Sequence, residues 1–209
     1  MQTTSWGERA AEQTSPTPTD GRTARRDRNR TAVLDAVIEL FDEDDLSPGV
    51  HEVARRSGVS LRSVYRYFDD VDALIAAAIE RQYERSRPHF TIPRLGQGPL
   101  AERIERFCRA RVALYLRVRT VFVAATLRAR LDRQVAEGLD WSRSQLSRQT
   151  EAMFAPELDA LAEADRQVTF VTLDVLTQFE TLELLRETRD FDEQSTVEYL
   201  VETFTDRFA

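Results

Sequence analysis

The chain has 209 residues, and 42% of them are hydrophobic, which is enough to build a core for one large or two small domains. It has one cysteine, no run of about 18 apolar residues and no signal-peptide layout, which argues against a disulfide framework, a cysteine-rich zinc site and a membrane span, so we expect a soluble, cytoplasmic protein. The net charge of −7 argues against a nucleic-acid partner unless the positive charge is locally concentrated.

The positive charge is in fact concentrated in two short segments. Residues 22–30 contain five arginines and one aspartate, and residues 55–66 contain four arginines and no acid. Attraction to phosphate acts over a Debye length of about 8 Å at physiological salt, so local charge matters more than the total. These two segments are therefore compatible with DNA binding by an acidic protein.

The N-terminal part of the chain predicts an arm followed by a helix. Residues 1–21 are rich in Thr, Ser and Pro without apolar periodicity, which is typical of a disordered arm. A helix is expected from about Thr23 to Asp42, where the acids that follow oppose the negative end of the helix dipole. Its apolar residues recur at helical spacing and predict one buried face: Val33, Ala36, Val37, Leu40 and Phe41.

Two short helices joined by a tight turn are predicted next. Ser47 followed by Pro48 is typical of a helix start, and Gly58 is typical of its end. Ser60 is predicted to cap a third helix over Leu61–Phe68. The spacing of these signals predicts a helix-turn-helix unit.

A specific residue pattern runs through this region and on to Asp70, which is predicted to cap a fourth helix. The pattern comprises Leu40-Phe41, Val53-Ala54, Gly58-Val59-Ser60, Tyr65-x-Tyr67-Phe68 and Asp70-x-Asp72-x-Leu74. Over residues 25–80 the sequence resembles the TetR family of transcriptional regulators. It departs from the family at Pro48-Gly49, where a hydroxyl residue is usual, at Val71, where a lysine is usual, and at Arg62, where a small residue is common.

The composition favours helices, and together with the resemblance it predicts an all-α fold of about nine helices. The predicted organisation is a disordered arm over residues 1–21, a helix-turn-helix DNA-binding domain over 22–72, and a helical effector-binding and dimerisation domain over 73–209.

The third helix is expected to enter the major groove of DNA, which is about 12 Å wide. Residues at its start are predicted to read base edges, and the tyrosines and the other arginines are predicted to hold phosphates. The predicted DNA-binding residues are Arg25, Arg26, Arg28, Arg30, Arg55, Arg56, Ser60, Leu61, Arg62, Ser63, Tyr65, Arg66 and Tyr67. The alternative is that Tyr65 belongs partly to the core and that several arginines form only a solvated surface.

The remainder of the chain predicts further helices after a linker. Residues 87–99 contain three prolines and two glycines, which indicates a loop between domains. A long helical pattern begins at Leu100, with a weak interruption at Gly138 and a break at Pro156. Two last helices are expected over Asp165–Thr188 and Asp192–Phe208.

The Asp165–Thr188 helix is apolar on more than one side, which predicts burial against both the core and a second subunit. The resemblance implies a homodimer whose interface is built by the last two helices of each subunit. The alternative is a helix that is central to a single domain. A twofold dimer predicts a palindromic DNA operator.

The helical body also contains candidate residues for an effector pocket. Aromatic side chains with a few polar groups among them would suit a small apolar or aromatic molecule. The predicted residues are Phe107, Arg111, Tyr115, Phe122, Trp141, Phe170, Thr177 and Gln178. The alternative is that the aromatic residues are core.

The predicted function is that of a repressor which leaves its operator when the effector binds, as the resemblance implies. Regulation by a partner protein, regulation without an effector, and a helical carrier or enzyme with an incidental helix-turn-helix remain alternatives. The only histidines, His51 and His89, have no cysteine or aspartate at catalytic or metal-ligand spacing. No catalytic residue, metal or cofactor is therefore predicted.

Overall fold

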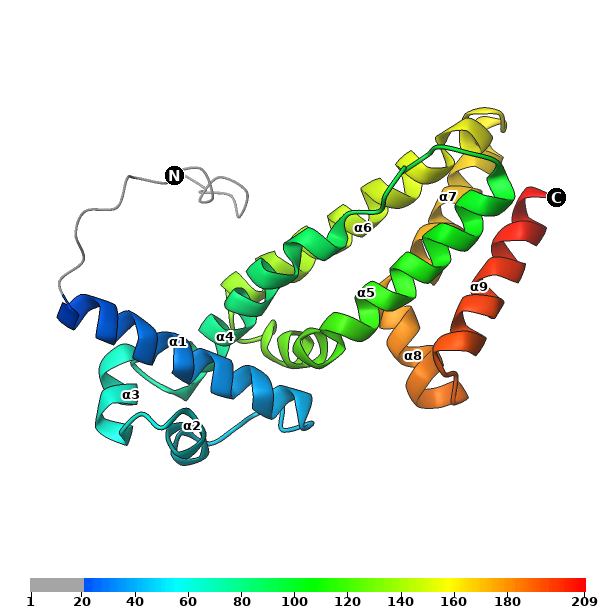
Figure 1. Cartoon of the computed structure of the whole chain (residues 1–209). Coiled ribbons are helices and arrows are strands. Elements are labelled where there is room, and N and C mark those ends of the chain that lie inside the picture. The colour runs from blue at the N-terminus through cyan, green and yellow to red at the C-terminus, as the bar shows by residue number, and fades with distance from the viewer. Residues whose placement is uncertain (1–20) are drawn as a thin grey trace. The chain divides into compact units, whose positions relative to one another are not determined.

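The computed structural model describes residues 21–209, and these contain nine α-helices, one 3-10 helix and no strand (Figure 1). This confirms the prediction of an all-α fold with about nine helices. The elements are α1 (Gly21–Asp42), α2 (Val50–Ser57), α3 (Leu61–Tyr67), α4 (Val71–Ser86), η1 (Arg87–Phe90), α5 (Leu100–Arg128), α6 (Arg133–Asp159), α7 (Glu163–Leu176), α8 (Phe179–Arg189) and α9 (Glu193–Phe208).

The chain forms two compact units. The first contains the described residues up to Arg85 together with Thr120–Trp141, and the second contains Ser86–Arg119 and Ser142–Ala209. Residues 120–128 of α5 thus belong to the first unit and the preceding part of this helix to the second. The predicted arm lies outside the described residues except for Gly21, which begins α1.

In the first unit, α1 lies across α2 and α3 and packs against both (Figure 1). Val33, Val37 and Phe41 of α1 are completely buried, and so is Val53 of α2. Burying an apolar side chain of this size stabilises a fold by about 1.5–3 kcal/mol. The apolar stripe predicted for the first helix is therefore part of the core of this unit.

Helix α4 is joined to α1 by polar contacts in addition to its apolar face. The Arg81 guanidinium donates to Asp35 of α1 over 2.9 Å, and Arg85 donates to the same carboxylate over 3.1 Å. These ion pairs link α4 to α1, on which α2 and α3 pack.

The start of α2 differs from the prediction. Ser47 does not cap it, since Gly49 is the N-cap residue, without a side-chain hydrogen bond, and its carbonyl accepts from the Val53 N–H over 3.1 Å. The Ser47 N–H instead donates to the Asp45 carboxylate over 3.3 Å. Pro48 is buried ahead of the helix, and the residue before a proline is sterically biased away from helical geometry.

The other predicted signals in this region are confirmed. Gly58 ends α2 with φ 66°, a left-handed conformation that favours glycine. The Ser60 hydroxyl caps α3 by accepting from the Ser63 N–H over 3.3 Å. The Asp70 carboxylate likewise accepts from the Ala73 N–H over 2.7 Å at the start of α4.

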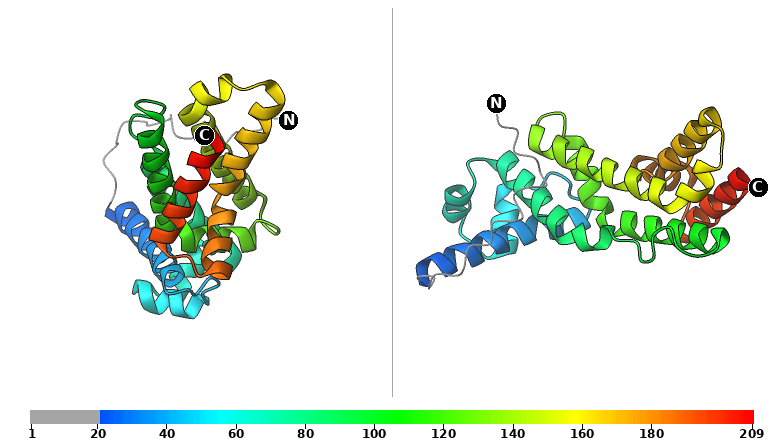
Figure 2. Two further views of the ribbon diagram at one scale, coloured as in Figure 1. Left: turned by 90° about the vertical axis from the view of Figure 1, so that its right-hand side faces the viewer. Right: turned by 90° about the horizontal axis from the view of Figure 1, so that it is seen from above.

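The second unit is built around aromatic packing. Helix α9 runs beside the first part of α5 and beside α7 (Figures 1 and 2). Phe107 of α5 lies 5.2 Å from Phe154 of α6 and 5.9 Å from Phe204 of α9, between ring centroids, and all three are completely buried. These distances are typical of favourable aromatic pairs.

Three helix boundaries show where the sequence prediction succeeded and failed. The long helical pattern is interrupted at residues 129–132, not at Gly138, which lies inside α6. The predicted break at Pro156 is confirmed as a kink at Phe154, whose φ and ψ are −115° and 15°. The single helix predicted over Asp165–Thr188 is wrong, because the chain divides into α7 and α8 at Thr177 and Gln178.

The division between α7 and α8 has a local cause. The Thr177 hydroxyl donates to the Leu173 carbonyl over 3.0 Å, and Gln178 adopts extended geometry with ψ 149° before α8 begins. Side-chain hydrogen bonds of this kind to the preceding turn compete with the helix backbone. None of the described helices is long and apolar enough to cross a membrane.

Candidate nucleic-acid interface

Helix α3 exposes one side of its short length and buries the other. Val64 is only 1% exposed and anchors the helix, whereas Tyr65 is 50% exposed. Arg62 and Arg66 are also exposed, and Leu61 is half-buried. The helix therefore presents a polar side with two arginines and a tyrosine, as a groove-reading helix requires.

The start of α3 is held by two serines. Besides accepting from the Ser63 N–H, the Ser60 hydroxyl donates to the Ser63 hydroxyl over 3.0 Å. This fixes the first turn of the helix, where Arg62 projects. A residue that reads a base must be held by such local contacts, because specificity depends on its orientation.

A basic hollow lies between α1 and α3, with a cavity volume of about 370 Å³. Its lining residues are Arg25, Arg26, Asn29, Ser63, Arg66 and Tyr67. The Arg66 guanidinium donates to the Tyr67 hydroxyl over 3.1 Å and lies 5.2 Å from the centroid of its ring. Three arginines and no acid line the hollow, so it suits an anionic group such as a DNA phosphate.

The other predicted arginines of α1 are placed differently. Arg28 is exposed but does not line the basic hollow. The guanidinium of Arg30 lies 5.2 Å from the centroid of the Phe68 ring, a cation–π arrangement that orders its side chain. The structure therefore brings Arg25 and Arg26 together with α3 and leaves Arg28 and Arg30 outside the hollow.

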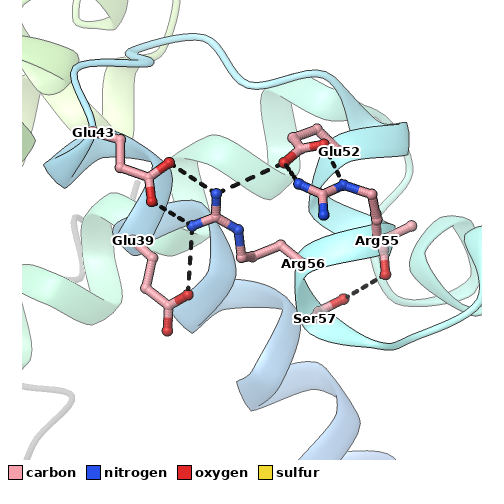
Figure 3. Close-up of polar contacts among 7 residues, drawn as sticks. Glu39, Glu43, Glu52, Arg55, Arg56 and Ser57 are labelled. Atoms are coloured by element: carbon pink, nitrogen blue, oxygen red, sulfur yellow. Dashed lines mark hydrogen bonds and ion pairs between the residues drawn. The ribbon is translucent and has the colours of Figure 1, made fainter.

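Arg55 and Arg56 of α2 are occupied by acids, as Figure 3 shows. The Arg56 guanidinium donates to both carboxylate oxygens of Glu43, over 2.7 and 2.8 Å, and lies 3.9 Å from Glu39. The Arg55 Nε donates to Glu52 over 2.8 Å. The hydrogen bonds from Arg56 lower the pKa of the Glu43 carboxyl, and those from Arg55 lower the pKa of the Glu52 carboxyl.

This pairing distinguishes two kinds of arginine on the first unit. Within the described part of the chain, no ion pair joins Arg26, Arg62 or Arg66 to a carboxylate. Among the described residues, Arg55 and Arg56 of α2 are thus paired with neighbouring acids, while Arg26 of α1 and Arg62 and Arg66 of α3 are not. The sequence could not show this, because Glu43 and Arg56 are 13 residues apart.

The predicted effector-binding residues are divided between the two units. Phe122 and Trp141 belong to the first unit. The other six belong to the second, namely Phe107, Arg111, Tyr115, Phe170, Thr177 and Gln178. Phe107 is part of the aromatic core, and Thr177 and Gln178 form the joint between α7 and α8.

Arg111 and Tyr115 are both buried, each with a partner that the sequence did not indicate. The Arg111 Nη2 donates to the Leu146 carbonyl over 3.0 Å, and the Tyr115 hydroxyl contacts the Glu183 carboxylate. Burial raises the pKa of Tyr115, and the adjacent Glu183 raises it further. Across residues 21–209, no group of three or more His, Cys, Asp or Glu side chains could hold a metal ion.

Comparison with known proteins relates part of the first unit to a family. Residues 33–78 match the family model described as bacterial regulatory proteins, tetR family. The fold is similar to the crystal structure of a tetR-family transcriptional regulator from Streptomyces coelicolor, with a TM-score of 0.66 and 21% identity over 87% of this chain and 80% of that one. Over residues 33–78 the chain therefore matches the TetR family.

Two further similar proteins are informative. An uncharacterized helix-turn-helix transcriptional regulator of Mycobacterium tuberculosis is 39% identical over 69 residues, which cover 32% of this chain and 34% of the relative. The chain thus matches about a third of the length of its curated relatives. A putative transcriptional regulator from Saccharomonospora viridis, solved in complex with choline, has the same fold with a TM-score of 0.60 and 13% identity over 88% of this chain and 96% of that one.

Proposed function

We propose that this protein is a DNA-binding transcriptional repressor of the TetR family that binds a palindromic operator as a homodimer and is released by a small-molecule effector. The observation that carries the DNA-binding part is the basic hollow between α1 and α3, together with the exposed side of α3. Because that charge is not balanced by neighbouring acids, it is available to phosphates in an otherwise acidic protein.

In the proposed complex, α3 enters the major groove with its first turn toward the base edges. Arg62 is the best placed residue for guanine O6 and N7, a contact worth about 1–3 kcal/mol of base discrimination. Ser63 and Leu61 flank it on the same turn. Arg25, Arg26 and Arg66 would hold the backbone phosphates and fix the helix in register.

We propose a smaller contribution to DNA binding from Tyr65, Tyr67 and the remaining basic residues. Tyr65 is exposed on α3 and can donate its hydroxyl to a phosphate. Arg28 and Arg30 add positive charge near the start of α1. Arg55 and Arg56 would first have to leave Glu52 and Glu43, so we propose that they contribute less than the arginines of α1 and α3.

An exposed apolar face on α7 supports the proposed dimer. Val168, Val171 and Val175 follow one another at helical spacing on one face and are 59%, 48% and 53% exposed. Leu184 of α8 is 57% exposed. Contiguous apolar surface of this kind is typical of a protein interface.

Helix α9 differs from α7 in where its apolar residues lie. Its apolar stripe of Val197, Leu200 and Phe204 is buried within its own unit. We therefore propose that α7 and α8 supply most of the apolar contact between protomers and that α9 supports them from within each subunit.

The proposed effector acts by favouring one arrangement of the dimer over another. A coupling free energy of about 1–3 kcal/mol between effector and DNA is enough for a useful switch. The contacts of α4 with Asp35 give such a change a route to α1 within the first unit. The choline complex of the Saccharomonospora viridis protein supports a small-molecule ligand for this fold. Because the proposed partner is chromosomal DNA, the proposed place of action is the cytoplasm.

Fluorescence anisotropy of the full chain with labelled duplexes tests this proposal. The duplexes would be palindromes from the intergenic DNA upstream of the gene, compared with scrambled sequences of equal length at several salt concentrations. We expect affinity for both to fall steeply with salt and one palindrome to bind more tightly than its scrambled partner. Binding that is absent at low salt, or that does not respond to salt, would contradict the proposal.

A further inference from the structure

A buried arginine of the second unit stands between two aromatic residues along one side of α5. Phe107, Arg111 and Tyr115 follow one another on one side of α5, and all three are buried. The Arg111 guanidinium lies 4.9 Å from the centroid of the Phe107 ring, and the Tyr115 ring lies 6.0 Å from that of Phe179. A charged group has thus been placed in a mainly apolar interior.

Arg111 lacks the partners that a buried arginine normally has. Its side chain is 1% exposed, and only Nη2 donates a hydrogen bond, to the Leu146 carbonyl. Nε and Nη1 have no acceptor among the described residues. Asp174 attracts the guanidinium electrostatically, but the two form no ion pair. Buried charges in native proteins are usually paired, because an unpaired one is costly to desolvate.

Two further buried polar atoms, one on α6 with Leu146 and one just after α7 with Asp174, have no partner in the described structure. They are the Ser142 hydroxyl oxygen and the Gln178 Oε1. Ser142 stands one helical turn before Leu146 on α6, and the Gln178 Nε2 donates to Asp174 over 2.9 Å. Unsatisfied buried groups are rare in native structures, so several of them on neighbouring elements are candidates to bind the polar groups of a ligand. We name Arg111, Ser142, Asp174 and Gln178 the Arg111 cluster.

The chemistry of the Arg111 cluster restricts the charge of that ligand. A single guanidinium balances one negative charge, and the nearby Asp174 would oppose a second. Burial lowers the pKa of Arg111 to about 9, while the charge of Asp174 acts in the opposite direction, so Arg111 stays protonated at neutral pH. A singly charged carboxylate therefore fits better than a dianionic phosphate.

Building on the proposed effector function, we propose that Arg111 binds the carboxylate of a small monocarboxylate effector whose apolar or aromatic body packs against the rings flanking Arg111. Gln178 Oε1 can only accept, so it would receive a hydroxyl or amino donor of the ligand. Ser142 can donate to the carboxylate or accept from the same donor. Gln178 is the N-cap residue of α8, so ligand binding there would affect the joint between α7 and α8.

Thermal unfolding of the full chain tests the site with sodium benzoate as the probe. Benzamide, which has the same shape without the charge, is the matched ligand control at equal ionic strength, and propionate and octanoate vary the apolar body. We expect benzoate or another of these carboxylates to raise the Tm of the wild type progressively with concentration, and benzamide to leave it unchanged.

Three variants separate a binding role of Arg111 from a structural one. Arg111→Met should abolish the carboxylate-dependent rise in Tm and, without ligand, should melt at the wild-type temperature or higher, because it removes an incompletely paired buried charge. Arg111→Lys should reduce the rise, since the ammonium lacks the planar fork. Arg109→Gln, an exposed charge on the same helix, should keep the full rise.

The outcomes distinguish this proposal from the proposed function. No carboxylate-dependent rise in the wild type, a rise that persists in Arg111→Met, or a fall in the Tm of ligand-free Arg111→Met beyond that of Arg109→Gln would each overturn the carboxylate site. Salt-dependent DNA binding measured on the same samples would still support the proposed function as a DNA-binding regulator. A carboxylate rise without DNA binding would uphold the site and reject the regulator.

Discussion

Replacing Arg26 by alanine should flatten the salt dependence of DNA binding, whereas replacing Arg56 should leave it nearly unchanged. Both arginines belong to the first unit, but Arg26 lines the basic hollow and Arg56 donates to both carboxylate oxygens of Glu43. A phosphate contact by Arg56 would have to break those hydrogen bonds and leave the Glu43 carboxylate close to DNA. Its net gain in attraction should be small.

The expected magnitude follows from counterion release. Each phosphate neutralised by a protein cation contributes about 0.9 to the slope of log K against log salt, and a dimer carries two copies of each arginine. Arg26→Ala should therefore reduce the slope by ~1.8. Between 50 and 200 mM salt, the affinity of Arg26→Ala for DNA should therefore fall about tenfold less than that of the wild type.

The measurement is anisotropy of a labelled duplex at five or more salt concentrations, for wild type, Arg26→Ala and Arg56→Ala. Circular dichroism of each variant checks that the helical fold is retained. Equal reductions in slope for the two variants, or a larger one for Arg56→Ala, would refute the assignment of phosphate binding to α1 and α3.

Three further substitutions test other parts of the account. Arg62→Ala should cost about 1–3 kcal/mol on the preferred palindrome and much less on scrambled DNA, by anisotropy, and an equal loss on both would remove Arg62 from base reading. Val171→Asp should convert the dimer to a monomer in sedimentation equilibrium, while Leu131→Asp, which changes an exposed leucine of the first unit, should stay dimeric. Gly58→Ala should lower stability to thermal unfolding by about 1–2 kcal/mol through its left-handed φ of 66°, with no steric clash, and an unchanged Tm would show that the turn relaxes.

Signals that act over a few residues were read well from the sequence. Gly58 ends α2, and Ser60 and Asp70 cap the helices that follow, as expected. The buried stripe of α1 was also correctly predicted, because helical periodicity directly reflects which side faces the core. These features depend on backbone chemistry and local spacing, which a single sequence contains.

Features that depend on distant partners were missed. The pairing of Arg56 with Glu43 needs the packing of α2 on α1, which the sequence does not give. The α7–α8 joint was missed because the apolar pattern continues through Thr177, whose hydroxyl bonds the preceding turn.

Arg111 was predicted to line an effector pocket, but its complete burial was not predicted, since arginine is usually exposed. One signal could have indicated it, namely its position between Phe107 and Tyr115 on the same side of α5. A charged residue in the middle of an apolar helix face is either buried or at a binding site. The sequence alone does not decide between these two outcomes, because they depend on which residues of α6 and α7 face Arg111.

Selection of binding sites from a pool of random duplexes tests the central claim most directly, because it presumes no operator. The full chain would be mixed with the pool at moderate salt, and bound sequences enriched and read over several rounds. We expect an inverted repeat whose half-site centres are separated by about 34–36 Å, one helical turn, or a multiple of it. Failure to enrich any sequence, or enrichment of a motif without twofold symmetry, would contradict it.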